Sequence, residues 1–213
     1  MTQIELKSIT KAFKNQILFT NFNFIFEGGK IYGLVGHNGS GKTILMKIIC
    51  GLVRPNTGEV WYNHEQLIGR DIPFLPSLGT ILETPGFLDN YTGFENLKQL
   101  ALIDNKIDDK EIRDTMELLG LDSLSKKKVK AYSLGMRQKL ALCQAIMENP
   151  DVLILDEPMN GLDKVSVQLV RQLLDDLKKQ GKLIILASHT EEDIKLLCDE
   201  VIDITEYNKD KIL

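Results

Sequence analysis

One short segment constrains the fold more than any other: residues 36–43, which read Gly-His-Asn-Gly-Ser-Gly-Lys-Thr. An apolar run at residues 31–35 precedes it, and a helix-forming stretch at residues 42–50 follows it. Glycines let the backbone curl so that successive N–H groups point inward, and the following helix adds its positive end. The segment therefore predicts a strand, a loop and a helix that together hold an anion such as phosphate.

The side chains of this segment indicate which phosphates are bound. We expect Lys42 to reach the β- and γ-phosphates of a nucleotide, and the Thr43 hydroxyl to bind Mg²⁺. A glycine turn that arose by chance is the alternative, but the strand before and the helix after are the context that the pattern requires. The other loop residues expected at the nucleotide are Gly36, Asn38, Gly39, Ser40 and Gly41.

Two kinds of strand pattern predict two sheets. Apolar and polar residues alternate at 4–7, 21–26 and 60–63, which is typical of antiparallel strands with one polar face. The later runs, at 152–155, 183–187 and 201–204, are apolar on both faces and alternate with helical patterns. They predict an α/β fold with a mostly parallel core sheet covered by helices. We expect one domain, 1–213, with a small antiparallel β lobe and a helical lobe at about 86–145 inserted in the α/β core.

Two helical patterns make specific predictions about packing. In the segment 92–130 we expect one apolar face, made of Ile112, Met116 and Leu119. A later helix that stops at Gly181 has apolar residues at i, i+4, i+8 and i+12, namely Val165, Leu169, Leu173 and Leu177.

Composition limits the cellular setting. The chain has 213 residues, 30 of them acidic and 26 basic, so its net charge of −4 gives no support to nucleic-acid binding. Its longest apolar runs are about five residues, far short of the ~20 that span a bilayer, and the N-terminus has no secretory signal. The three isolated cysteines read as free thiols in a reducing compartment. We expect a cytoplasmic protein that binds no nucleic acid.

The basic residues Lys126–Lys128 and Lys130 form either a solvated face or a phosphate patch.

Two acids follow the apolar run at 152–155. Parallel strands deliver their C-terminal residues to the same edge of a sheet, so Asp156 and Glu157 should lie beside the phosphate loop. There Asp156 could hold Mg²⁺, and Glu157 could orient or deprotonate an attacking water. An Asp-Glu-Pro turn with a purely structural role is the alternative.

A second helix start is suited to an anion. Ser133 is a plausible N-cap, and Gly135 leaves its backbone N–H uncovered. An ordinary capped helix is the alternative reading. Because the chain has a single phosphate loop, this second anion site would close over the nucleotide of a second copy.

These segments, in this order, resemble the nucleotide-binding subunit of ATP-binding cassette (ABC) transporters over about residues 2–207. Residues 36–43 match the Walker A motif, and residues 153–157 match Walker B with its catalytic glutamate. Residues 133–136 fall where the LSGGQ signature falls. The resemblance implies three further site residues: Phe13 as the aromatic that stacks on adenine, His189 as the switch histidine beside the γ-phosphate, and Asp163 in the D-loop.

Three positions depart from the family pattern. The glutamine of the Q-loop appears as Glu83, which could still bind Mg²⁺ or water but cannot donate a hydrogen bond. Leu134 and Met136 replace a glycine and a glutamine of the signature. Ile44 replaces the second threonine of Walker A, and by the resemblance this position is still expected at the nucleotide. These sequences around Glu83 and Ser133 resemble a bacterial subgroup similar to bacitracin and lantibiotic exporters.

The resemblance implies an ATPase that uses Mg²⁺ and ATP, with Lys42, Glu157 and His189 as catalytic residues and Thr43, Glu83 and Asp156 at the metal. It implies a head-to-tail dimer with itself or a paralogue. It also implies a separate transmembrane permease, which would place the chain on the inner face of the cell membrane. Two alternatives are an ABC ATPase that acts in DNA, ribosome or iron–sulfur cluster assembly, and a catalytically silent regulatory module.

Overall fold

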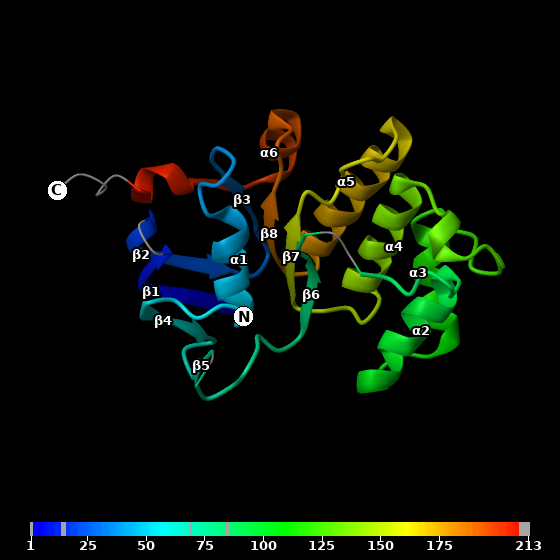
Figure 1. The fold of residues 1–213 in the computed structure, drawn as a ribbon, viewed down its shortest axis with the longest axis horizontal. Coiled ribbons are helices and arrows are strands. Elements are labelled where there is room, and N and C mark those ends of the chain that lie inside the picture. The colour runs from blue at the N-terminus through cyan, green and yellow to red at the C-terminus, as the bar shows by residue number, and fades with distance from the viewer. Residues whose placement is uncertain (1, 14–15, 69, 84–85, 209–213) are drawn as a thin grey trace.

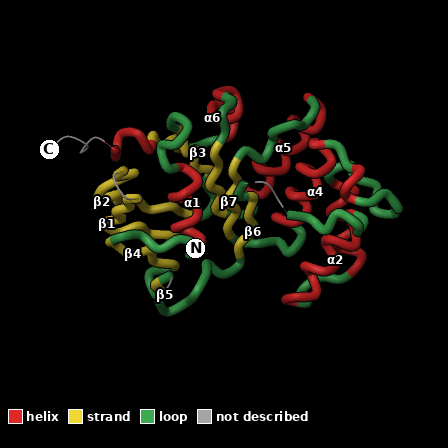
Figure 2. Tube along the Cα trace, in the orientation of Figure 1, coloured by secondary structure: helices red, strands yellow, loops and turns green. Residues whose placement is uncertain are grey.

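The computed structural model describes residues 2–13, 16–68, 70–83 and 86–208 (Figure 1). Its strands form two sheets that lie on either side of a helix, and further helices cover the outer face of the second sheet (Figures 1 and 2). The strands are β1 (Gln3–Phe13), β2 (Gln16–Glu27), β3 (Ile31–Val35), β4 (Thr57–Tyr62), β5 (Gln66–Leu67), β6 (Leu78–Ile81), β7 (Val152–Asp156), β8 (Leu183–Ala187) and β9 (Glu200–Asp203). The helices are α1 (Lys42–Cys50), α2 (Gly93–Asp104), α3 (Asp109–Leu118), α4 (Leu134–Ile146), α5 (Lys164–Lys179) and α6 (Glu191–Leu197), with short 3₁₀ turns η1 (Val129–Ala131) and η2 (Ile204–Asn208).

The first sheet is antiparallel and confirms the alternating pattern of the first third of the chain. Its order is β2-β1-β4-β5, and Leu6 lies between Phe24 of β2 and Val60 of β4. Phe22 and Phe26 are buried on its inner face, whereas Ile25 points outward and is exposed. One face therefore packs on the core and the other meets water.

The second sheet is parallel, in the order β6-β7-β8-β3-β9. Alternate residues of β7 enter two separate cores: Val152 and Ile154 pack toward the antiparallel sheet, and Leu153 and Leu155 pack toward the outer helices. Burial on both faces explains why this strand is apolar throughout. The predicted α/β fold with two sheets is confirmed. At the β9 edge, however, Val201 is half exposed, so this strand is not apolar on two buried faces.

Helix α1 lies between the two sheets, and α4 and α5 cover the opposite face of the parallel sheet (Figure 1). The chain between β6 and β7 forms α2, α3, η1 and α4. Capping boxes begin α2 at Thr92 and α3 at Asp108, which satisfies backbone N–H groups at both helix starts. Ile112, Met116 and Leu119 are buried together, as their spacing predicts.

The buried face of α5 differs from the predicted one. Val165 is 81% exposed and Leu169 is exposed as well, while Val170 and Leu174 are fully buried. A strict spacing of four residues drifts around an α-helix that has 3.6 residues per turn. Of the four predicted residues, only the last two, Leu173 and Leu177, therefore pack toward the core.

The cysteines lie mostly in the interior. Cys50 and Cys143 are buried and Cys198 is partly buried, and all three are free thiols. Burial raises the pKa of the Cys50 thiol to about 12, so it stays protonated and unreactive at neutral pH. Across the parts of the chain that the structure describes, no helix combines the length and apolarity needed to cross a membrane.

Gly79 of β6 lies directly against the end of α4. A Cβ at this position would overlap the carbonyl oxygen of Ala145. We predict that Gly79→Ala forces α4 away from the sheet and lowers the free energy of unfolding by about 3 kcal/mol, the upper part of the range for overpacking. Urea denaturation measures this change. Gly86→Ala is the matched control, because a Cβ there meets nothing within 4 Å, and its stability should stay within about 0.5 kcal/mol of wild type.

Candidate nucleotide-binding site

The loop between β3 and α1 has two positions whose backbone conformation is easily adopted only by glycine. Gly41 is the N-cap of α1 with φ of 109°, and Gly36 has φ of 145°. A Cβ on Gly36 would also press against the Ser40 hydroxyl. The first turn of α1 carries no acidic residue. Its N–H groups and positive helix end thus remain available to an anion, as the sequence predicts.

Lys42 is folded over this loop. Its side chain is buried, and its Nζ donates to the carbonyl oxygens of Gly36 at 2.7 Å and His37 at 3.3 Å. An ammonium has three N–H donors, so Nζ can keep these carbonyls and bind a phosphate oxygen at the same time. Lys42 thus lies where the loop would bring phosphates.

Thr43 and Asp156 meet at the C-terminal edge of the parallel sheet. The Thr43 hydroxyl donates to Asp156 Oδ2 at 2.6 Å, although the two residues come from α1 and β7. One hydroxyl and one carboxylate, both oxygen donors, match the way Mg²⁺ binds proteins when substrate phosphates complete its coordination. No cluster of three acidic, histidine or cysteine residues that could hold a metal alone occurs within the described residues. The donor set therefore fits a Mg²⁺ that enters with a nucleotide.

Glu157 lies next to Asp156 in an unusual backbone conformation, with φ of 51°. Its N–H donates to the Ala187 carbonyl at 2.9 Å, so the neighbouring strand β8 fixes its position. Its Oε1 is buried, has no hydrogen-bond partner among the described residues, and lies 3.6 Å from His189 Nε2. Burial raises the pKa of the Glu157 carboxyl; His189 opposes the rise and Asp156 adds to it. A carboxylate with a raised pKa is a stronger general base.

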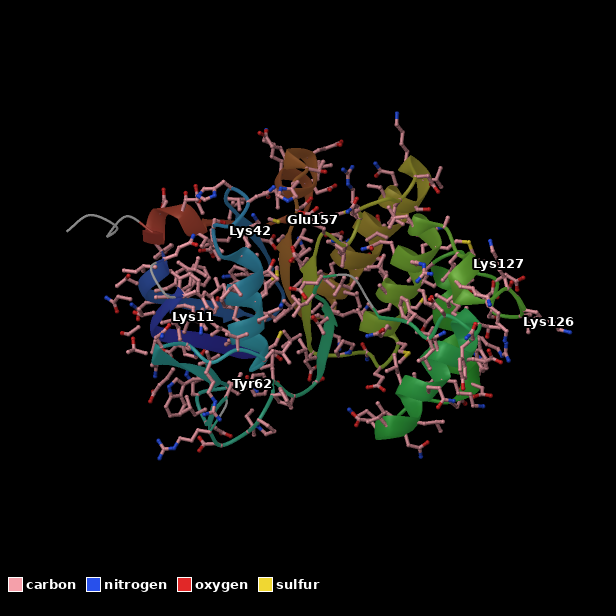
Figure 3. All side chains as sticks on the ribbon, in the orientation of Figure 1. Lys11, Lys42, Tyr62, Lys126, Lys127 and Glu157 are labelled. Carbon is pink, nitrogen blue, oxygen red and sulfur yellow. The ribbon has the colours of Figure 1, made fainter. Side chains whose placement is uncertain are left out.

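A cavity of about 630 Å³ joins these groups. Figure 3 shows Lys42 and Glu157 in the middle of the molecule, and Lys126 and Lys127 at its far edge. The predicted site residues that line the cavity are Phe13, Asn38, Gly39, Ser40, Gly41, Lys42, Thr43, Ile44, Glu83, Asp156, Glu157 and His189. The predicted residues that do not line it are Gly36, Ser133, Gly135 and Asp163.

Phe13 stands at the mouth of the cavity, at the end of β1. Its side chain is 47% exposed, and the Lys11 ammonium lies 4.7 Å from the ring centroid. Lys11 Nζ in turn donates to the Arg54 carbonyl at 2.8 Å. The ring is thus an exposed aromatic surface beside the phosphate loop, as an adenine platform requires.

Ser133 and Gly135 begin α4 next to the residues of the predicted D-loop. The Ser133 hydroxyl accepts a hydrogen bond from the Met136 N–H at 3.3 Å, which makes it the N-cap that the sequence predicts. A Cβ on Gly135 would lie 2.9 Å from the Gly161 carbonyl oxygen, so glycine permits this close approach. Asp163 caps α5, and hydrogen bonds from Ser166 lower the pKa of its carboxyl.

Glu83 forms an ion pair with Lys47, a residue not among the predicted site residues. Lys47 of α1 places its Nζ 2.5 Å from Glu83 Oε1, and Glu83 has φ of 60°. Lys47 follows Thr43 by one helical turn, so the i, i+4 spacing could have pointed to it. Glu83 thus lies at the edge of the phosphate cavity with its charge paired.

Five cavity residues were not predicted: Leu18, Leu134, Arg137, Gln138 and Asn160. Gln138 is the most informative, because its amide donates to the carbonyls of Glu157 at 3.1 Å and Pro158 at 2.8 Å. It follows Ser133 in the same helix, and no local pattern distinguishes it from a surface glutamine. Its contact depends on the packing of α4 against the end of β7, which are distant in sequence.

Residues 19–160 match the ABC transporter family. The chain belongs to that family. It is an ATP-binding subunit and an ATPase, as the ordered motifs predict. A solved structure of the ATP-binding subunit of an ABC transporter is similar in fold, with a TM-score of 0.82 and 25% identity over 94% of this chain and 86% of that one.

Three curated relatives are similar over most of this chain. An uncharacterized ABC transporter ATP-binding protein of Bacillus subtilis, YybJ, is 42% identical over 94% of this chain and 92% of its own length. The bacitracin transport ATP-binding protein BcrA of Enterococcus faecalis is 37% identical over 93% of this chain, but this covers only 65% of BcrA. The lantibiotic transport ATP-binding protein SrtF of Streptococcus pyogenes is 31% identical over 92% of this chain and 84% of SrtF.

The pairing of Glu83 with Lys47 leads to a prediction about nucleotide affinity. Glu83→Gln keeps the shape of the side chain and removes its charge, and the lost exposed ion pair is worth about 0–1 kcal/mol. We predict that the Kd for a fluorescent ATP analogue stays within about twofold of wild type, because Lys42 and the loop backbone hold the phosphates. Lys42→Ala, measured in the same fluorescence titration, should weaken binding strongly. Loss of binding in Glu83→Gln would contradict the peripheral role of Glu83.

Proposed function

We propose that this ABC subunit hydrolyses Mg-ATP at the cavity above the phosphate loop, dimerises around the nucleotide, and powers a separate transmembrane permease. The observation that carries the proposal is that Lys42, Thr43, Asp156 and Glu157 converge on one cavity. A phosphate cradle, a Mg²⁺ donor pair and a carboxylate of raised pKa are the parts that phosphoryl transfer to water requires.

Each residue has a distinct task in this proposal. The α1 N-terminus and Lys42 bind and orient the triphosphate. Thr43 and Asp156 would hold Mg²⁺, which when bound neutralises charge on the β- and γ-phosphates. Glu157 accepts the proton of the water whose oxygen bonds to the γ-phosphorus, while the bond from that phosphorus to the β–γ bridging oxygen breaks. His189, 3.6 Å from Glu157, donates a hydrogen bond to the γ-phosphate.

The positions of Ser133 and Gly135 support a dimer. They present a capped helix start and do not themselves line this chain's nucleotide cavity, although Leu134 between them does. A second copy or a paralogue arranged head to tail would bring this helix start over the γ-phosphate in the other chain's cavity. Each ATP would then lie between Walker A of one chain and α4 of the other. Hydrolysis removes the shared phosphate and loosens the pair.

The relatives support export of a peptide antibiotic or a similar solute. Two of them are named for bacitracin and lantibiotic transport, and each covers more than nine-tenths of this chain. The subunit would work at the inner face of the cell membrane, where its permease partner carries the solute.

The general base is tested by Glu157→Gln. The amide cannot accept the proton, so we predict a loss of kcat of about 10²–10⁴-fold, the usual contribution of general base catalysis. A phosphate-release assay on the purified chain measures it. Glu65→Gln, an exposed carboxylate of the antiparallel lobe, is the control and should keep wild-type kcat. Hydrolysis by Glu157→Gln at the wild-type rate would reject the assignment.

The same variant tests the dimer. With hydrolysis blocked, Glu157→Gln saturated with Mg-ATP should elute at twice the monomer mass in size-exclusion chromatography with light scattering. Adding Ser133→Arg, which places a bulky cation at the start of α4, should return it to monomer mass. A monomeric profile of Glu157→Gln at high concentration would contradict pairing with itself and leave a paralogue as the partner.

The permease is tested by co-purification. An affinity-tagged chain, isolated from detergent-solubilised membranes of its source cells, should retain a protein with several membrane-spanning helices. Retention of ribosomes, DNA or iron–sulfur assembly proteins in place of a membrane protein would favour the rival class of ABC ATPase.

A further inference from the structure

The short loop between β8 and α6 is held from both sides of His189. The Ser188 hydroxyl accepts a hydrogen bond from the Thr190 N–H at 3.1 Å and donates to Asp193 Oδ2 at 3.2 Å. The residues before and after His189 are thereby joined to each other and to α6. The His189 side chain itself is 59% exposed. Its direction therefore depends on the backbone of this loop more than on packing around the ring.

Asp193 is fixed by an arginine from another element. Arg171 of α5 directs its Nε and Nη2 to Asp193 Oδ1, at 2.9 Å and 2.5 Å. Both side chains are buried, whereas Glu192, 3.1 Å from Arg171 Nη2, is largely exposed. A buried ion pair pays a desolvation cost that offsets much of its attraction, so stability alone explains it poorly. Its two directed bonds do specify one geometry.

Helix α5 provides a rigid base for this pair. It has 16 residues, begins at the Asp163 cap, and buries Val170 and Leu174 on either side of Arg171 in sequence. Such a helix fixes the backbone from which Arg171 extends, and the planar guanidinium presents its donors in a fixed fork. The chain of contacts thus runs from α5 through Arg171, Asp193 and Ser188 to the backbone beside His189.

We propose that Arg171, Asp193 and Ser188 are positioning residues that set the direction of His189 toward the γ-phosphate. The inference rests on the role of His189 in the proposed function. It goes beyond that function because it makes α5, which starts at the D-loop, part of the support of the switch histidine. A small change in this loop would alter catalysis without altering nucleotide affinity, since none of the three residues lies at the phosphate cradle.

The experiment is a double-mutant cycle between Ser188 and His189 in the full chain. Ser188→Ala removes one hydroxyl and leaves the Arg171–Asp193 pair intact, so the variant is expected to fold. A misplacement of about 1 Å costs up to roughly 10²-fold in rate. We expect kcat to fall about tenfold or more, with KM for Mg-ATP and the Kd for a fluorescent ATP analogue within about twofold. Ser188→Thr, which keeps the hydroxyl, should restore kcat.

The double-mutant cycle distinguishes a positioning role of Ser188 from a purely structural one. If Ser188 acts through His189, adding Ser188→Ala to His189→Ala lowers kcat no further. Glu192→Gln, which removes the exposed partner of Arg171, is the matched control and should keep wild-type kcat. Melting temperatures of all variants, measured in parallel, should agree within a few degrees.

Three results would overturn the inference: wild-type kcat in Ser188→Ala, losses that multiply in the double variant, or a fall in kcat that tracks a fall in melting temperature. Wild-type kcat in His189→Ala would also overturn it, by removing the group to be positioned. Failure of the proposed function would appear separately, as a wild-type chain that releases no phosphate from Mg-ATP or as Lys42→Ala with normal nucleotide binding.

Discussion

The hydrogen bond between Thr43 and Asp156 joins residues 113 positions apart. It forms only because several features of the fold bring the two residues together. It requires that β3 and β7 run in the same direction with only β8 between them. It also requires that α1 start directly at the sheet edge. Both conditions depend on burial: β7 and β8 are buried along nearly their whole length, and α1 is enclosed by two sheets. Hydrophobic packing thus fixes a polar contact that no local interaction could create.

The same arrangement gives the site its electrostatic character. Strand β8 lies between the strands that carry the phosphate loop and the acids, so His189, just beyond its end, comes within 3.6 Å of Glu157. Glu157 is then a partly buried carboxyl next to another carboxylate, and both surroundings raise the pKa of its side chain. The order of the strands therefore places this carboxyl beside the histidine that follows β8.

The sequence predicts those features whose cause is local or periodic. The phosphate loop, the strands at 152–155 and 183–187 that are buried on both faces, and the Ser133 cap each follow from a few neighbouring residues, and the structure has them where expected. Phe13 and His189 could be singled out only through family resemblance, because an exposed aromatic or a loop histidine has no distinctive local pattern. Lys47, Gln138 and Arg171 were missed because their importance lies in partners from distant segments. The predicted buried face of α5 was wrong at Val165 and Leu169, because a spacing of four residues exceeds the helical period of 3.6.

Helix α4 contacts two neighbouring segments of the chain, the predicted D-loop and the end of β7. Near its first residues Gly135 approaches the Gly161 carbonyl, and one turn further Gln138 binds the carbonyls of Glu157 and Pro158. A helix is stiff over so short a distance, so a shift of α4 along its axis would move both contacts together. The backbone carbonyl of Glu157 and the exposed Ser133 at the start of α4 are therefore connected through the first turns of one helix. In the proposed head-to-tail pair, a shift of α4 caused by the neighbour's nucleotide would therefore also reach the backbone beside Glu157.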